Sequence, residues 1–157
     1  MTKGLEDFDF LEGKWRVRHR RLKERLAGCS DWAEFGGTCE ARKILGGLGN
    51  TDDNVLDMPD TPYHALSLRT FDPQSGLWTI WWIDSRRPRA LEPPLAGRFA
   101  DDVGTFYADD TFRGTAIRVR YLWTRIETDT PRWEQAFSAD GGKTWETNWI
   151  MDFARAP

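Results

Sequence analysis

Cysteine and histidine are scarce in this sequence, which has two of each in 157 residues. The spacing of Cys29 and Cys39 fits no zinc or iron motif, and no spacing ties His19 or His64 to either cysteine as a catalytic pair. We therefore expect no metal site, no cofactor and no cysteine–histidine hydrolase. In a reducing compartment both cysteines would stay free thiols.

The sequence also lacks a long apolar run and an excess of one charge. No segment approaches the roughly 20 apolar residues that cross a bilayer, and residues 1–7 hold no apolar stretch of signal-peptide length. The 22 basic and 25 acidic residues nearly balance, and the basic run at residues 16–25 has no interleaved aromatic side chains, which is typical of a solvated strand face. These absences predict a cytoplasmic protein with neither nucleic acid nor membrane as a partner.

The pattern that is present is that of strands. Helical periodicity ends at residue 12, and short alternating runs then recur with turn residues between them. We predict one all-β domain over residues 1–157, an antiparallel up-and-down barrel of about ten strands after a short N-terminal helical turn. The predicted strands are residues 15–25, 32–45, 54–58, 63–71, 77–84, 95–100, 105–108, 117–127, 132–138 and 144–153. A barrel of this size has no exposed edges and leaves room for an internal cavity.

The N-terminal residues suggest how one end of the barrel is closed. Leu5, Phe8, Phe10 and Leu11 form an apolar turn, and Gly13-Lys14-Trp15 follows at the start of the first strand. A Gly-x-Trp beneath a short N-terminal helix resembles the calycins, the superfamily of lipocalins, fatty-acid-binding proteins and nitrobindin-like proteins. With Trp145-Glu146-Thr147-Asn148-Trp149 near the other end, the pattern is similar to a bacterial family of lipocalin-like barrels. The resemblance implies a ligand-holding barrel and no particular reaction.

Two ligand sites known among calycins do not carry over to this chain. Nitrobindin-like proteins hold haem through a histidine on a late strand, and no histidine follows His64 here. Fatty-acid-binding proteins clamp a carboxylate with an Arg-x-Tyr pair, whereas Arg120 and Tyr121 are adjacent and would point to opposite faces. The resemblance therefore predicts a cavity without naming its ligand.

A second motif lies near the C-terminus. Ser138-Ala139-Asp140-Gly141-Gly142-Lys143-Thr144-Trp145 resembles the Asp-box of sialidase propellers, Ser-x-Asp-x-Gly-x-Thr-Trp. Asp140 would accept hydrogen bonds from turn amides, the glycines would permit positive φ, and Trp145 would cover the hairpin. No arginine triad or five-fold repeat accompanies it, so we interpret it as a folding device rather than a glycosidase site.

Alternation along the predicted strands assigns an inner face. With Trp15 and Val17 inward, His19 also points inward, and the late strands add further side chains to the lining. Residues expected to line the cavity and bind ligand are His19, Tyr121, Trp123, Trp133, Gln135, Thr147 and Trp149; Trp145 is expected on the same inner face.

Nine tryptophans allow two interpretations: large rings that fill a wide barrel, or rings that line a cavity for a flat apolar ligand. We predict that the barrel binds a small, mostly apolar, aromatic molecule. Residues 77–83 are apolar on both faces, which predicts that the outer face is covered in a homodimer.

A cofactor-free lyase or isomerase in the same cavity is the alternative hypothesis, with His19 as the general base and Asp53 or Asp84 orienting it. The segment Gly46-Gly47-Leu48-Gly49-Asn50 is no phosphate loop, because no Lys-Ser/Thr and no helix follow it, so we expect a flexible strand connection there.

Overall fold

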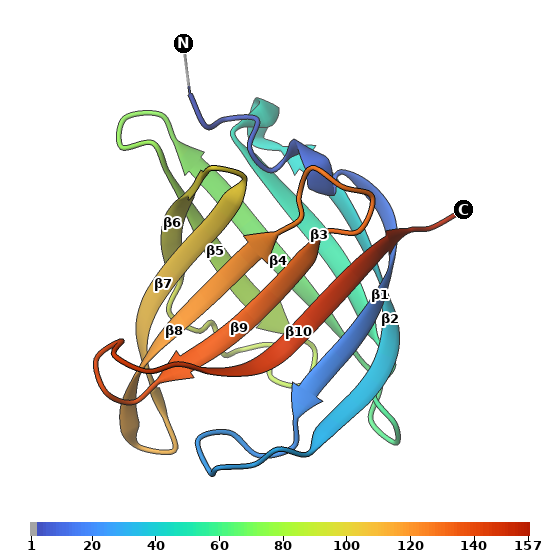
Figure 1. The fold of residues 1–157 in the computed structure, drawn as a ribbon. Helices are drawn as coiled ribbons and strands as arrows, with labels where there is room; N and C mark the ends of the chain where they lie inside the picture. Colours follow the sequence, from blue (N-terminus) through green and yellow to red (C-terminus); the bar gives the residue numbers. More distant parts are fainter. Residues whose placement is uncertain (1–2) are drawn as a thin grey trace.

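The computed structural model describes residues 3–157, and its strands form a closed antiparallel barrel (Figure 1). Each strand pairs with its neighbours along the chain, and β1 closes the ring by pairing with β10. The strands are β1 (Gly13–Leu22), β2 (Trp32–Ile44), β3 (Gly49–Leu56), β4 (Tyr63–Asp72), β5 (Leu77–Asp84), β6 (Leu95–Ala100), β7 (Val103–Phe112), β8 (Thr115–Thr124), β9 (Arg132–Ser138) and β10 (Glu146–Arg155). Short 3₁₀ helices, η1 (Asp9–Leu11) and η2 (Leu45–Gly47), precede β1 and β3. The prediction of an all-β, ten-stranded up-and-down barrel is confirmed.

The first part of β3 differs from the prediction. The strand begins at Gly49, inside the segment expected to be a flexible connection, and not at residue 54. Its residues have low intrinsic preference for strands, but β3 pairs along its whole length with β2 on one side and β4 on the other. Pairing on both sides therefore overrides propensity, and it turns Asn50, Asp52 and Asn54 into the barrel, where all three are buried.

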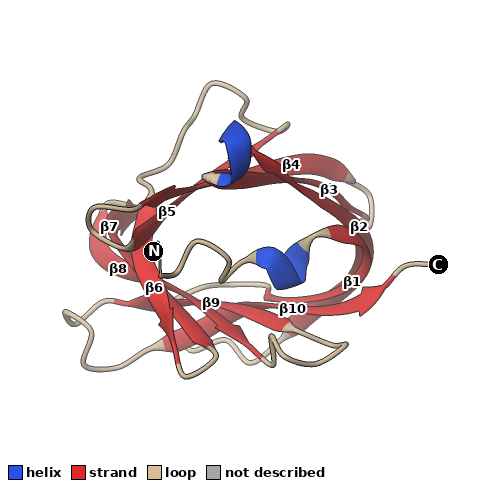
Figure 2. Cartoon of the chain, turned by 90° about the horizontal axis from the view of Figure 1, so that it is seen from above, coloured by secondary structure: helices blue, strands red, loops and turns tan. Residues whose placement is uncertain are grey.

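The N-terminal plug, residues 5–11, closes one end of the barrel. Seen along the barrel in Figure 2, η1 lies inside the ring of strands. The Trp15 indole N–H donates to the carbonyl of Leu11 at 2.7 Å, which ties β1 to the plug. The Phe8 ring is 2% exposed and packs edge-to-face on Trp78 and Phe99, with centroid distances of 4.9 Å to each. The Gly-x-Trp motif thus marks the point where the plug meets the first strand.

The turn between β9 and β10 is organised by Asp140. Its Oδ1 accepts hydrogen bonds from the backbone N–H groups of Lys143 (3.0 Å) and Thr144 (2.9 Å), and its Oδ2 accepts one from the Thr144 hydroxyl (2.5 Å). The hydrogen bond from the Thr144 hydroxyl is the main cause that holds the pKa of Asp140 well below its usual range, and the backbone bonds add to it. Trp145 packs outside the barrel, on the Arg120 guanidinium and the exposed Tyr107, so the expectation that it faces the interior is wrong.

A β-bulge explains why alternation misplaces this part of β10. Thr147 pairs with Ala136 and Trp149 pairs with Gln135, so that Asn148 is an extra residue in the ladder. The bulge reverses the inside–outside order, because one inserted residue shifts every following side chain to the other face. Thr147 consequently lies on the outer side of the sheet with Ala136, whereas Trp149 points inward, and the prediction of Thr147 as a cavity-lining residue is wrong.

Candidate functional site

The barrel is hollow at the end opposite the plug. A cavity of about 320 Å³ opens where β1 ends and where β7 turns into β8. Its lining is mixed: half of the lining residues are apolar or aromatic, and the other half are charged or polar. Trp82, Tyr121, Phe137 and Trp149 supply the rings, and Gln135 adds a polar group whose Nε2 donates to the buried Asn148 Oδ1 at 2.8 Å.

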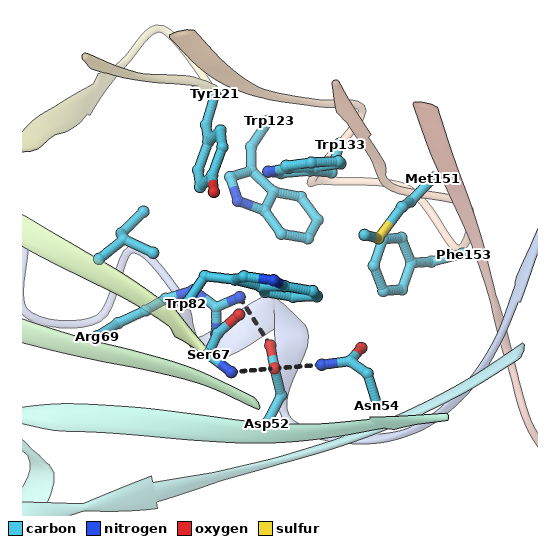
Figure 3. Close-up of a pocket in the computed structure, with 11 residues that line it drawn as sticks. Asp52, Asn54, Ser67, Arg69, Trp82, Tyr121, Trp123, Trp133, Met151 and Phe153 are labelled. Atoms are coloured by element: carbon cyan, nitrogen blue, oxygen red, sulfur yellow. Dashed lines mark hydrogen bonds and ion pairs between the residues drawn. The ribbon is translucent and has the colours of Figure 1, made fainter. Parts of the chain in front are cut away.

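Behind the cavity lies a much smaller inner void, shown in Figure 3. Trp82 and Tyr121 line both spaces and therefore stand between them. The void measures about 20 Å³, room for about one water molecule, since a water needs roughly 10–15 Å³ measured in this way. Trp123 and Trp133 are among the side chains that fill this inner half. Of these two spaces inside the barrel, only the outer cavity has the volume of a small ligand.

A buried polar network from β3 and β4 borders the inner void, and the bonds that Asp52 makes in it are visible in Figure 3. Arg69 pairs with Asp52, Nη2 to Oδ2 at 2.7 Å, and donates from Nη1 to Asn50 Oδ1 at 2.8 Å. Asp52 Oδ1 accepts further bonds from Asn54 Nδ2 (2.6 Å) and the Ser67 backbone N–H (3.0 Å). The side chains of Arg69 and Asp52 are 5% and 4% exposed, so this is a buried ion pair whose carboxylate is fully engaged.

Arg21 and Arg25 reach the outer cavity from the end of β1. Arg21 is 7% exposed; it donates to the Tyr63 hydroxyl at 2.5 Å and to Met58 Sδ at 3.2 Å. Its guanidinium carbon lies 4.0 Å from the Trp149 ring centroid, a cation–π contact. Arg25, partly buried, lies over the Phe137 ring at 5.6 Å. The cavity therefore has cationic groups in its wall beside its aromatic rings.

His19 points inward, as alternation predicts, but it does not face the cavity. It is 1% exposed and stacks on Phe35 at 4.7 Å, and its Nδ1 accepts a hydrogen bond from the Trp149 indole N–H at 3.1 Å. Burial, followed by the charge of Arg21, lowers the pKa of His19 to about 3. The imidazole is therefore neutral at pH 7 with its basic nitrogen already bonded, and the hypotheses that it binds ligand and acts as general base are not supported by the structure.

The two acidic partners proposed for His19 also lie elsewhere. Asp53 is exposed on the outer side of β3, because it is Asp52 that points inward. Asp84 lies at the rim of the cavity, where its carboxylate binds the Arg86 guanidinium at 3.1 Å. Neither forms a hydrogen bond to His19, so the structure does not bring the predicted catalytic group together.

The remaining predicted residues divide between the two spaces. Tyr121, Gln135 and Trp149 line the outer cavity, and Tyr121 also reaches the inner void, which Trp123 and Trp133 line. Sequence reasoning missed Trp82 and Arg69, as well as Arg21 and Arg25 in the cavity wall. A signal existed for Arg21, because continuing the phase of His19 by two residues places it inside. The polar alternation of Asn50, Asp52 and Asn54 is a second signal, which marks the inward polar strand that Arg69 contacts.

The structure is thus a closed up-and-down barrel, plugged at one end and hollow at the other. The chain resembles the solved structure of the S-type phycobiliprotein lyase CPES from Guillardia theta, with a TM-score of 0.60 and 11% sequence identity over 97% of this chain and 92% of that one. No family model matches the chain, and no curated protein matches its sequence. At this identity the likeness concerns the fold.

Two further findings concern residues 3–157. No helix there is long and apolar enough to cross a membrane. Within the same part of the chain, no three histidine, cysteine, aspartate or glutamate side chains lie together in an arrangement that could hold a metal ion.

Proposed function

We propose that this protein binds a small, mostly apolar, aromatic ligand in the outer cavity of its barrel. The observation that supports this function is the cavity itself: about 320 Å³, lined by the rings of Trp82, Tyr121 and Trp149. Small-molecule sites typically measure about 300–1,000 Å³, with apolar walls and a few fixed polar groups. Gln135, held in place by Asn148, and Arg21 are such groups. A resident cofactor is not part of the proposal.

A neutral fluorescent probe, N-phenyl-1-naphthylamine, tests this function. We expect saturable one-to-one binding, with enhanced probe fluorescence and quenching of the tryptophans that line the cavity. Ala108→Trp should weaken binding at least about tenfold, because Ala108 lines the cavity and a large ring there would fill it. Ala96→Trp on the paired strand β6 is the matched control, since Ala96 is exposed, pairs with Tyr107 and does not line the cavity. Linear, non-saturating partition of the probe would contradict the proposal.

A cofactor-free lyase or isomerase acting in the same cavity is the second candidate, and the description of the structural neighbour as a lyase favours it. Among residues 3–157, Asp52 is the one buried carboxylate, but it is bonded by Arg69, Asn54 and Ser67 and borders the inner void instead of the outer cavity. This arrangement supports binding over catalysis. Native mass spectrometry and chromatography of any copurifying molecule, before and after long incubation, distinguish the two, because an enzyme would convert it.

We also propose that the outer face of β4 and β5 joins two copies of the chain. Trp78 and Trp82 point inward, whereas Trp81 and Ile83 lie outside beside Leu66, which is 40% exposed. Trp81→Lys should therefore raise the dimer dissociation constant at least about tenfold, because a charge would be buried in an apolar interface. Sedimentation measures this, with Val103→Lys on β7 as the control. A wild-type protein that is monomeric at micromolar concentration would contradict the proposed dimer.

A further inference from the structure

Arg21 and Arg25, two of the arginines that line the cavity, lack an anionic partner. Within residues 3–157, no carboxylate lies within 4.0 Å of either guanidinium, although seven other ion pairs form in the same part of the chain. Arg21 is more than nine-tenths buried, and the groups that contact its guanidinium are neutral: the Tyr63 hydroxyl, the Met58 sulfur and aromatic rings. The charges of Arg86 and Asp84 act on it from farther away. The Arg21 Nε is buried and has no hydrogen-bond partner among the described residues. A buried guanidinium in this state is unfavourable unless an anion arrives.

The two arginines also repel each other. Burial is the main cause that lowers the pKa of Arg25, to about 10, and the nearby charge of Arg21 is the second. Both side chains remain charged at neutral pH and face the same cavity. An anion placed there would relieve the repulsion and supply the missing partner.

The other charged groups of the cavity do not cancel this excess. Five arginines line it against three acids, and Asp84 is already paired with Arg86. The other two acids are Glu92 and Asp110, and the other two arginines are Arg87 and Arg113. The apolar rings and the unpaired positive charge thus occupy one enclosed space.

From this we infer that the ligand is an aromatic acid, whose ring packs against Trp82 and Trp149 and whose anionic group binds Arg21 and Arg25. The inference rests on the proposed ligand-binding function and adds the chemical class of the ligand. A neutral aromatic molecule would leave the Arg21 charge buried and unpaired, whereas an acid would form charge-assisted hydrogen bonds with it.

A matched pair of probes tests the inference. N-Phenyl-1-naphthylamine and 8-anilinonaphthalene-1-sulfonate share one aromatic body, and only the second carries an anionic group. We expect the wild type to bind the sulfonate at least about tenfold more tightly, because a charge-assisted contact with a buried guanidinium is worth about one factor of ten or more. Arg21→Met and Arg25→Met should each remove most of this preference and leave the affinity for the neutral probe within about threefold.

Arg20→Met is the control, since it removes the same charge from the same strand but outside the barrel: Arg20 pairs with Glu34 and Ile150 on the face opposite His19. Equal affinity for the two probes in the wild type would overturn the inference while the proposed function stands. The inference would also be overturned if Arg20→Met lost the preference for the sulfonate probe as fully as the cavity variants do. In that case the attraction would come from the general positive charge of the surface. Absence of binding by either probe would overturn the inference together with the proposed function. Circular dichroism checks folding, and if Arg21→Met does not fold, the more exposed Arg25→Met decides the outcome.

Discussion

Replacing Arg69 with methionine should lower the free energy of unfolding by about 3–5 kcal/mol, the usual cost of removing one partner from a buried ion pair. The variant leaves the Asp52 carboxylate in the interior with its charge uncompensated, and it also leaves Asn50 without the bond from Nη1. Denaturant unfolding followed by circular dichroism at neutral pH measures the loss.

The double variant Asp52→Leu/Arg69→Met is the informative control for this prediction. It should be more stable than Arg69→Met alone, because no charge remains buried, and apolar replacement of both partners of a buried pair is often close to neutral. A decrease of less than about 1 kcal/mol in the free energy of unfolding of Arg69→Met would contradict the closed interior, because it would mean that water reaches the ion pair.

Removing the ring at the centre of the plug should have an effect of similar size. Phe8→Ala should cost about 3–5 kcal/mol, the range for truncating a buried phenylalanine. The ring packs on Trp78 and Phe99 and lies 5.1 Å from the Arg69 guanidinium carbon, so its loss leaves a cavity and removes a cation–π contact.

Two controls accompany this plug variant in thermal and denaturant unfolding. Phe8→Leu keeps most of the volume and should lose less than half as much stability as Phe8→Ala. Leu91→Ala removes a leucine that is 60% exposed and should change stability by no more than about 0.5 kcal/mol. A Phe8→Ala protein as stable as the wild type would show that the plug is not part of the folded core.

The architecture could be predicted because it depends on features that alternate or repeat along the chain. Trp15 and Val17 face inward in the structure as the pattern indicates, and the turns fall where glycine, proline and aspartate cluster. The plug could be predicted for the same reason, since four apolar residues in a short segment before the first strand have few places to be buried. Local pattern and global fold agree in these parts of the chain.

The site was harder to predict because it depends on which face of its strand each side chain occupies and on which side chains from distant strands contact it. One extra residue at Asn148 reverses the order in β10, and this moved Thr147 outside. The structure turns Asp52 inward instead of Asp53, in a strand that begins at Gly49 and not at residue 54. The inward direction of His19 was correct, but no pattern shows that Trp149 would donate to its Nδ1 and separate it from the cavity.

A chain emerging from the ribosome cannot complete this barrel until its last strand has been synthesised. β1 is held on one side by β10, and Trp15, which anchors the plug, packs against Phe153. Contacts between residues so distant in sequence form slowly, because the loop entropy is lost before the contacts stabilise the fold. The inner faces of the middle strands, with Trp78 and Trp82, are therefore exposed during much of translation. We expect nascent chains that lack β10 to be the form that aggregates or recruits chaperones.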